Sequence, residues 1–369
     1  MSRSRAAVVL AVLSLAACSG EQPGRVAGPP ASSSASSAPA PESFTLVATG
    51  DVLVHQGGRL TGGAEQPDGS HDFRPVFAPV AGIIGAADLA ICHLETPVAP
   101  EGGPYRGYPS FAVQPEIVDA LAGAGYDLCS TASNHSLDDG FEGLVRTIDA
   151  LRSAGIAPSG TYRSQAESTA ATLVDVDGVR VGHVAATFGL NGVPLPPGRE
   201  WSVDVVEPPD VEAMLAAAAR ARAAGAQMVV ATLHCCREYQ HDPTAAQDAA
   251  VRTLVASPDV DLVLGHHAHV VQPFELVEGE WVAHGLGNHL AEHATRGHPT
   301  EDSVAARFTF TRGPDGRFAV SRAEAVPLTI DLGPDAVRIV PAGPEAFARI
   351  AAVLDRRGAV ADGLEVVPG

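Results

Sequence analysis

The chain has 369 residues, 46% of them hydrophobic, which is enough for one large domain or two small ones. Its formal net charge is −19, and its 24 basic residues are all arginines. A surface this acidic repels nucleic acid and anionic lipid headgroups, and an anionic polymer would be repelled unless metal ions neutralised the site locally.

The first 17 residues have the pattern of a secretory signal peptide. A basic start precedes an apolar run, Ala6 to Leu15, that is too short to span a bilayer. The letters LAAC, ending at Cys18, resemble the bacterial lipobox. We therefore expect a lipid on Cys18 that holds the protein at the extracytoplasmic face of the cell membrane. The alternative is an ordinary secretory signal with an incidental cysteine.

Three further parts follow the signal peptide. Residues 18–43 are rich in Ser, Pro, Ala and Gly without periodicity, which predicts a disordered tether. Residues 44–330 form the expected domain, and residues 331–369 form a C-terminal extension with a closing helix at Gly343 to Arg357. Within the domain, Ser303 to Ile330 alternates apolar and polar residues around GPDG and predicts a β-hairpin.

The body of the domain predicts an α/β fold. Short aliphatic runs alternate with alanine-rich amphipathic stretches, and four of these stretches are expected as helices, at residues 116–124, 141–154, 211–224 and 245–256. The aliphatic runs are nearly continuous, which is typical of strands covered on both faces.

Each main aliphatic run ends in residues that suit chemistry, and the carboxyl ends of strands in α/β sheets are where ligands gather. Any one of these residues alone is commonly a turn or cap residue. Together they supply the carboxylate, amide and imidazole ligands of a two-metal hydrolytic site for Mn, Fe or Zn, with ions ~3.5–4 Å apart. The expected metal ligands are Asp51, Glu95, Asn134, His234, His267 and His269. His135, next to Asn134, is expected to protonate a leaving group or steady a phosphate.

Six blocks in this order resemble the CapA family of bacterial capsule (poly-γ-glutamate) synthesis proteins, which looks like a branch of the calcineurin-like metallophosphoesterases. The blocks are TGDVLVH, ADLAICHLETPV, TASNHSLDDG, LHCCREYQHDPTAAQ, LVLGHHAHVVQP and HGLGNHL. The resemblance covers residues 44 to about 330. It implies a four-layer α/β/β/α sandwich with mixed sheets and an active site at the C-terminal ends of strands, with Glu95 as the bridging ligand.

The chain departs from the family pattern at several positions. The metallophosphoesterase Asp-x-His is missing, because His55 comes two positions too late. His289 stands where the family commonly has Phe, and Cys235 and Cys236 stand where it commonly has Trp-Gly. These two cysteines could ligate a softer metal, form a vicinal disulfide or simply pack.

The other two cysteines of the domain each end an apolar run. Cys92 and Cys129 are expected either as buried free thiols or as a bridge between neighbouring strands.

Further residues could support the site or contact substrate. His266 is expected there because alternation along an extended segment would place it opposite His267 and His269. Instead of contacting substrate, Arg74 and Arg106 could form salt bridges on the surface of this acidic protein. The full set is His55, His93, Arg74, Arg106, Tyr108, Glu238, His266, Asn288 and His289.

Two functions fit these observations. The first is an extracytoplasmic metal-dependent hydrolase acting on a phosphate-containing small molecule or an anionic polymer. The second is a non-catalytic, membrane-anchored component of a polymer synthesis or export complex, with membrane proteins as partners and a structural or vestigial metal site. No G-x-S-x-G elbow is present, which argues against a serine hydrolase.

Overall fold

The computed structural model describes residues 42–293, 298–333 and 336–369. The expected signal peptide, the lipidation at Cys18 and nearly all of the expected tether lie outside these ranges. Within them, no helix is long and apolar enough to cross a membrane.

The larger of two sheets has nine strands and mixed direction. Four parallel neighbours form one half, namely β1 (Ser43–Val52), β2 (Leu89–Leu94), β3 (Leu128–Ser130) and β4 (Ala157–Ser159). On the other side of β1 come three antiparallel strands, β12 (Asp302–Arg312), β13 (Phe318–Leu332) and β14 (Val337–Pro341). Two short strands pair in parallel with β1 and β13 respectively, β11 (Asn288–Leu290) and β15 (Leu364–Val366).

The smaller sheet has six strands in the order β5-β6-β7-β8-β10-β9. The four central strands are parallel, and they are β6 (Val179–Thr187), β7 (Met228–His234), β8 (Leu262–His266) and β10 (Glu280–Ala283). The two edge strands are antiparallel to their neighbours, and they are β5 (Thr172–Val176) and β9 (Phe274–Val277).

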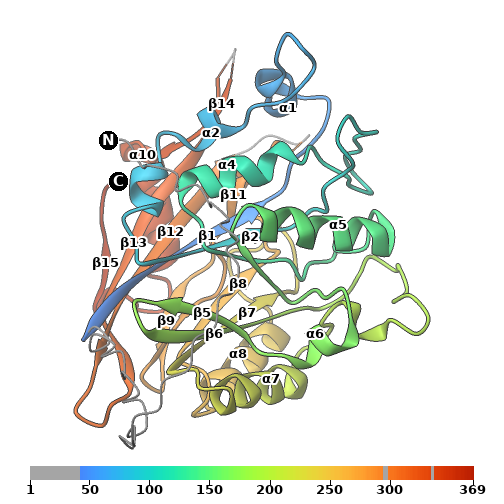
Figure 1. Cartoon of the computed structure of the whole chain (residues 1–369). Coiled ribbons are helices and arrows are strands. Elements are labelled where there is room, and N and C mark those ends of the chain that lie inside the picture. The colour runs from blue at the N-terminus through green and yellow to red at the C-terminus, as the bar shows by residue number, and fades with distance from the viewer. Residues whose placement is uncertain (1–41, 294–297, 334–335) are drawn as a thin grey trace, which may run out of the picture. The chain divides into compact units, whose positions relative to one another are not determined.

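Helices cover the outer faces of both sheets (Figure 1). The larger sheet is covered by α1 (Arg59–Ala64), α2 (Arg74–Phe77), α3 (Ala81–Ile84), α4 (Glu116–Ala124) and α5 (Gly140–Ser153). The smaller sheet is covered by α7 (Glu212–Ala223) and α8 (Ala245–Val255). The remaining helical segments are α6 (Gln165–Thr169), a 3-10 turn (Glu200–Ser202), α9 (His298–Glu301) and α10 (Pro344–Leu354).

The two sheets face each other across a central apolar core. Leu46 and Ile91 of the larger sheet pack in one cluster with Val230 and Leu264 of the smaller sheet. All four side chains are almost completely buried. This core explains why the strands carry aliphatic residues on their inner faces.

The neighbours of these residues point outward, because successive strand residues alternate between faces. Val47 packs with Leu121 of α4 on one side of the molecule. Val229 packs with Ala218 of α7 and Leu254 of α8 on the other. Both faces of both sheets are therefore covered, and the expected four-layer α/β/β/α sandwich with mixed sheets is confirmed.

The later part of the chain joins the larger sheet. The expected hairpin is present as β12 and β13, and its turn is closed by a hydrogen bond from Gly313 N to Arg317 O. The closing helix is present as α10. Residues 331–369, expected as an extension, add β14 and β15 to the sheet, because β13 continues to Leu332 before the chain turns back.

Candidate metal centre

The carboxyl ends of five strands meet at one place between the sheets. Strands β1, β2 and β3 bring it residues at or just after their carboxyl ends from one sheet, while β7 and β8 do so from the other. This convergence brings together all six expected ligands, none of which is more than 3% exposed.

Gly50 lets β1 approach its neighbour closely enough to place Asp51. The backbone N–H of Asp51 donates to Gly287 O at 2.9 Å. A Cβ on Gly50 would lie 2.0 Å from that same carbonyl oxygen, so no larger residue fits. The Gly-Asp pair in TGDVLVH is therefore required by the packing of the backbone.

Asp51 is bound on both carboxylate oxygens. Its Oδ1 lies 2.7 Å from Nδ1 of His266, and its Oδ2 lies 3.2 Å from Nδ1 of His269. Burial acts to raise the pKa of Asp51, but hydrogen bonds from these two histidines outweigh it and hold the pKa well below its usual value. Asp51 is thus an anion at neutral pH.

Glu95 is buried without a hydrogen-bond donor among the described residues. It follows β2, is 1% exposed, and neither of its oxygens has a hydrogen-bond partner among the residues that the structure describes. Its Oε1 lies 3.7 Å from Nε2 of His269 and 4.0 Å from Nε2 of His234. Burial raises the pKa of Glu95 to about 7. A buried carboxylate with no donor and imidazoles at this distance fits a divalent cation between them.

His269 lies between the two carboxylates. Burial acts to lower its pKa, but Glu95 and Asp51 raise the pKa of His269 to about 10. A cation held by the same carboxylates would compete with this proton, as metal binding to imidazole generally does.

The two remaining expected histidine ligands are neutral. Burial lowers the pKa of His267 to about 3 and the pKa of His234 well below its usual value. Nε2 of His234 lies 2.9 Å from Oδ1 of Asn134, and its Nδ1 lies 2.9 Å from Nε2 of His93. A neutral imidazole whose second nitrogen is fixed by a neighbour is suited to hold a metal.

Two triads of side chains could each hold an ion. In each triad, one ligand atom per residue lies within 4.8 Å of the others. The triads are Asp51, His93 and His234, and Glu95, His267 and His269. The first triad includes His93, which was expected only as a supporting residue.

His135 sits beside the triads in a network of its own. Its Nδ1 lies 2.6 Å from Oδ2 of Asp138 and 3.4 Å from Nδ2 of Asn191. Burial acts to lower the pKa of His135, but the hydrogen bond to Asp138 and the charge of Glu95 raise it. Sequence reasoning missed Asp138 and Asn191. The only available signal was the position of Asp138 three residues after His135.

The expected alternation of the three adjacent histidines is wrong. Strand β8 ends at His266, and the backbone then turns, with φ of 82° at His267 and 54° at His269. His266 therefore does not face away. Its ring stacks on His93 with centroids 4.2 Å apart, and it binds Asp51.

Three other supporting candidates, Asn288, His55 and Glu238, border the cluster. Oδ1 of Asn288 lies 2.9 Å from Nδ1 of His269. His55 lies with its Nδ1 3.2 Å from Leu53 O and belongs to neither triad. Glu238 is half-buried, and its charge contributes to the raised pKa of Glu95.

The remaining candidates have other contacts. His289 is buried in a polar network away from the triads, with its Nε2 3.0 Å from the hydroxyl of Tyr126. It follows Asn288 in β11, so it points to the opposite face of the sheet. Arg74 forms a salt bridge of 2.8 Å with Asp72, and Arg106 forms one of 2.6 Å with Asp139. Tyr108 is 81% exposed.

Both cysteine pairs are joined. A disulfide links Cys92 to Cys129, which are register partners in β2 and β3. Cys235 and Cys236 form a vicinal disulfide directly after His234. Of the three alternatives for this pair, the structure has the disulfide.

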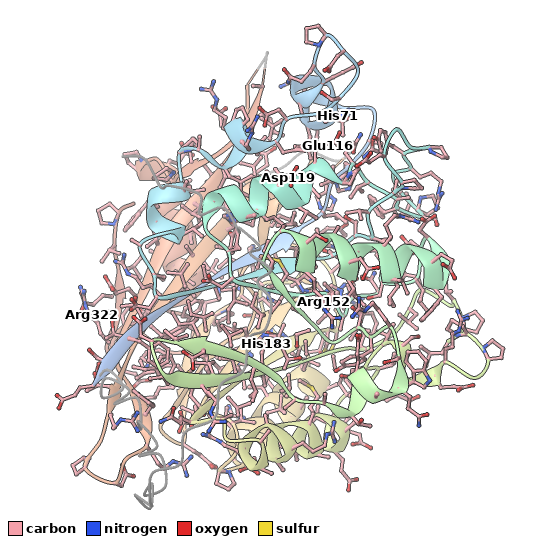
Figure 2. The ribbon with its side chains drawn as sticks, in the orientation of Figure 1. His71, Glu116, Asp119, Arg152, His183 and Arg322 are labelled. Atoms are coloured by element: carbon pink, nitrogen blue, oxygen red, sulfur yellow. A yellow bond between two sulfur atoms is a disulfide. The ribbon has the colours of Figure 1, made fainter. Side chains whose placement is uncertain are left out.

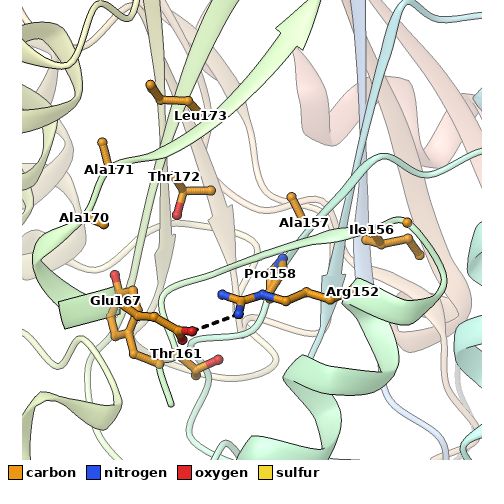
Figure 3. A pocket seen from close by; sticks show the side chains of 12 residues that line it. Arg152, Ile156, Ala157, Pro158, Thr161, Glu167, Ala170, Ala171, Thr172 and Leu173 are labelled. Atoms are coloured by element: carbon orange, nitrogen blue, oxygen red, sulfur yellow. Dashed lines mark hydrogen bonds and ion pairs between the residues drawn. The ribbon is translucent and has the colours of Figure 1, made fainter. Parts of the chain in front are cut away.

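Two polar features lie outside the triads. His183 of β6 is buried near the centre of the molecule (Figure 2), where its Nε2 lies 2.9 Å from the hydroxyl of Thr232. A cavity of about 410 Å³ opens beside β4 and β5 and contains an ion pair of 2.8 Å between Arg152 and Glu167 (Figure 3). None of the expected site residues lines this cavity.

Comparisons with known proteins agree with the family resemblance. Residues 45–293 match the family described as "Bacterial capsule synthesis protein PGA_cap". The "PGA biosynthesis protein CapA" of Bacillus subtilis (strain 168) is 27% identical over 255 residues, which are 67% of this chain and 64% of that protein. A "Probable polyglutamine synthesis accessory protein" of Mycobacterium tuberculosis (strain ATCC 25618 / H37Rv) is 29% identical over 214 residues, 55% of each chain.

The chain thus spans less than two thirds of the length of these relatives. Among solved structures, a calcineurin-like phosphoesterase, YfkN from Bacillus subtilis, aligns with a TM-score of 0.48 and 16% identity, over 87% of this chain and 95% of that one.

Proposed function

The chain belongs to the bacterial capsule synthesis protein PGA_cap family, and from this premise we propose that it is an accessory protein of capsule or poly-γ-glutamate synthesis with a metal-dependent phosphoesterase site. The observation that carries the proposal is the burial of Glu95 without a hydrogen-bond donor in the described part of the chain. Both of its oxygens are enclosed without a donor among the described residues, while His234 and His269 approach from the opposite sheet. Such a cluster of carboxylate and imidazole groups is suited to bind divalent cations.

The two triads would hold the metal, with Asn134 beside His234, and His266 would fix Asp51. Ions bound there would act as Lewis acids toward a phosphoryl group and orient water. In hydrolysis the water oxygen bonds to phosphorus as the phosphorus–oxygen bond to the alcohol breaks. The departing oxygen then needs a proton.

His135 is suited to give that proton. Asp138 engages Nδ1 at 2.6 Å, which orients the ring and leaves Nε2 to face a leaving group. The raised pKa of His135 favours the protonated ring that a general acid requires. Asn191 contacts both His135 and Asn134, and so ties the acid to the ligand set.

The proposed location is the extracytoplasmic face of the membrane, with a lipid on Cys18. The signal pattern and the lipobox-like LAAC support this location. We further propose partners among membrane proteins of polymer synthesis or export; the relatives, a PGA biosynthesis protein and a probable polyglutamine synthesis accessory protein, support only the link to polymer synthesis. A non-catalytic accessory role remains the second candidate, because His55 belongs to neither triad and so does not restore the missing Asp-x-His ligand.

Hydrolysis of small phosphoesters tests the proposal. The purified protein, stripped of metal and then given Mn²⁺ or Zn²⁺, should hydrolyse p-nitrophenyl phosphate, and Asp51→Asn and His267→Ala should abolish the activity. Glu365→Gln, a surface change on β15, serves as the matched control and should keep it. If the wild type binds metal yet hydrolyses no ester with either ion, the non-catalytic role is favoured.

A further inference from the structure

Three loops around the metal centre each expose one large apolar or aromatic side chain. In the described part of the chain, four large hydrophobic side chains are exposed, Tyr108, Val193, Tyr239 and Val360. Single exposed residues of this kind are ordinary on any surface. Here the first three lie on separate loops that contact either the centre or Asp138, which holds His135, whereas Val360 lies beyond α10.

Tyr239 is anchored to the loop that carries His267 and His269. Its backbone N–H donates to Ala268 O at 2.8 Å, and its ring centroid lies 6.1 Å from that of His269. The side chain is nevertheless 54% exposed. The ring therefore contacts His269 and, edge-on, His293, while about half of the residue stays open to solvent.

The backbone of Tyr239 is in the left-handed region, with φ of 60°. Six described residues other than glycine have positive φ, and two of them, Asp177 and Glu278, lie in turns between paired strands. The other four all border the centre, and they are Asn191, Tyr239, His267 and His269. Such conformations cost free energy and persist where the surroundings impose them, most often at functional sites.

The other two loops are anchored on the His135 side. Ser110 of the Tyr108 loop donates to Asp138 O at 2.9 Å, and Asp138 holds His135. Val193 closes a tight turn through a hydrogen bond of 2.8 Å to Leu190 O, and within this turn Asn191 contacts Asn134.

We propose that Tyr108, Val193 and Tyr239 form a binding rim for a flat ring on the alcohol side of the phosphoester, with Tyr239 as its platform. This inference rests on the proposed function. A phosphoryl group must reach the buried ligands, so the rest of the substrate has to cross these loops. Aromatic faces bind planar rings by stacking. Arg106, on the same loop as Tyr108, is paired with Asp139, which also binds Arg146.

The first experiment measures binding rather than turnover. Dissociation constants of phenylphosphonate and methylphosphonate, two non-hydrolysable ligands with the same anionic group, are compared by calorimetry in the presence of Mn²⁺. The wild type should bind the phenyl compound at least about fivefold more tightly, the lower limit for stacking on an aromatic side chain. Tyr239→Ala and Tyr239→Leu should bring the ratio to about one, whereas Tyr239→Phe should preserve it.

Val360→Ala provides the matched control, because Val360 is equally an exposed apolar residue but lies outside the rim. It should leave the ratio unchanged. Equal affinity of the wild type for the two phosphonates, binding of neither, or an undiminished ratio in Tyr239→Ala would overturn the inference.

The second experiment separates this inference from the proposed function. Hydrolysis of benzyl phosphate and ethyl phosphate is compared, because their leaving alcohols are similarly acidic and differ mainly in the ring. A higher kcat/KM for benzyl phosphate supports both proposals. Equal hydrolysis of both esters would support the phosphoesterase function and contradict the binding rim. Tighter binding of phenylphosphonate without hydrolysis of either ester would support the binding rim and contradict the phosphoesterase function.

Discussion

Nδ1 of His135 lies 2.6 Å from Oδ2 of Asp138, and both side chains are less than 10% exposed. The ring of Phe111 also packs edge-on against His135, with centroids 4.8 Å apart. The imidazole is thus fixed in orientation by one polar and one apolar contact. A ring held in this way can act as an acid at one defined position.

Replacement of His135 should affect poor leaving groups most. We expect His135→Ala to lower kcat/KM for an alkyl phosphate by roughly 10²–10⁴-fold, the usual contribution of a general acid. The loss should be much smaller for p-nitrophenyl phosphate, whose leaving group needs little protonation. Asp138→Asn should show the same pattern more weakly. Equal losses for the two esters would contradict the assigned role.

Loss of the Cys92–Cys129 disulfide should destabilise the domain. The bridge closes a loop with a sequence separation of 37, for which the chain-entropy model gives about 4 kcal/mol. Denaturant unfolding of Cys92→Ala/Cys129→Ala should show a loss of this order. Reductant should destabilise the wild type but not the double variant, because the Cys235–Cys236 bridge spans adjacent residues and restricts the unfolded chain little. A double variant as stable as the oxidised wild type would contradict this.

Alanine at Gly50 should unfold or strongly weaken the domain. The added Cβ would lie 2.0 Å from Gly287 O, so β1 and the strand beside it would have to separate. We expect a loss of at least about 2 kcal/mol in the free energy of unfolding, together with reduced metal binding. Gly62→Ala in α1 is the matched control, because its Cβ meets open space. It should stabilise the protein by about 0.5–1 kcal/mol.

Acid should weaken a network around Glu275. This carboxylate contacts His284 at 3.0 Å, Arg357 at 2.7 Å and Arg252 at 2.9 Å. The hydrogen bond from His284, aided by the two arginines, outweighs burial and holds the pKa of Glu275 well below its usual range. A depressed pKa gives stability that is complete above the unfolded value of about 4.3 and is lost as the pH falls below it.

Glu275→Gln tests this dependence. At pH 7 it should cost about 1–3 kcal/mol, the range for hydrogen bonds to a charged group. The difference between wild type and variant should shrink as the pH falls below about 4, because the carboxylate of the unfolded wild type is then protonated while the folded one, with its depressed pKa, stays charged. A difference that stays constant from pH 7 to pH 3 would show that the contribution is not ionic.

The sequence predicted that the site residues would lie close together, because they stand at the carboxyl ends of strands. Asp51, Glu95 and His234 each follow or end an aliphatic run, and parallel strands in two packed sheets bring these ends together. The layer order was predictable for a related reason, since continuous apolar runs require cover on both faces.

The positions that sequence reasoning did not predict are set mainly by the folding of loops. His266 does support the site through Asp51, but the alternation used to predict this fails, because it holds only in extended backbone and the chain turns at His267. Asn191 lies 57 residues from Asn134, and its contact arises only once the loop after β6 has folded. His289 was grouped with the site because it adds an imidazole where the family commonly has Phe, whereas the pleat of β11 turns its ring toward Tyr126.

Metal content tests the central claim most directly. The purified wild type, stripped by chelation, equilibrated with Mn²⁺ or Zn²⁺ and desalted, should retain about two ions per chain by elemental analysis, as a dinuclear site requires. Glu95→Gln should retain fewer than one, because it removes the buried carboxylate that faces both His234 and His269. Glu365→Gln should match the wild type. A wild type that retains no ion, or a Glu95→Gln protein that retains as many as the wild type, would contradict the account.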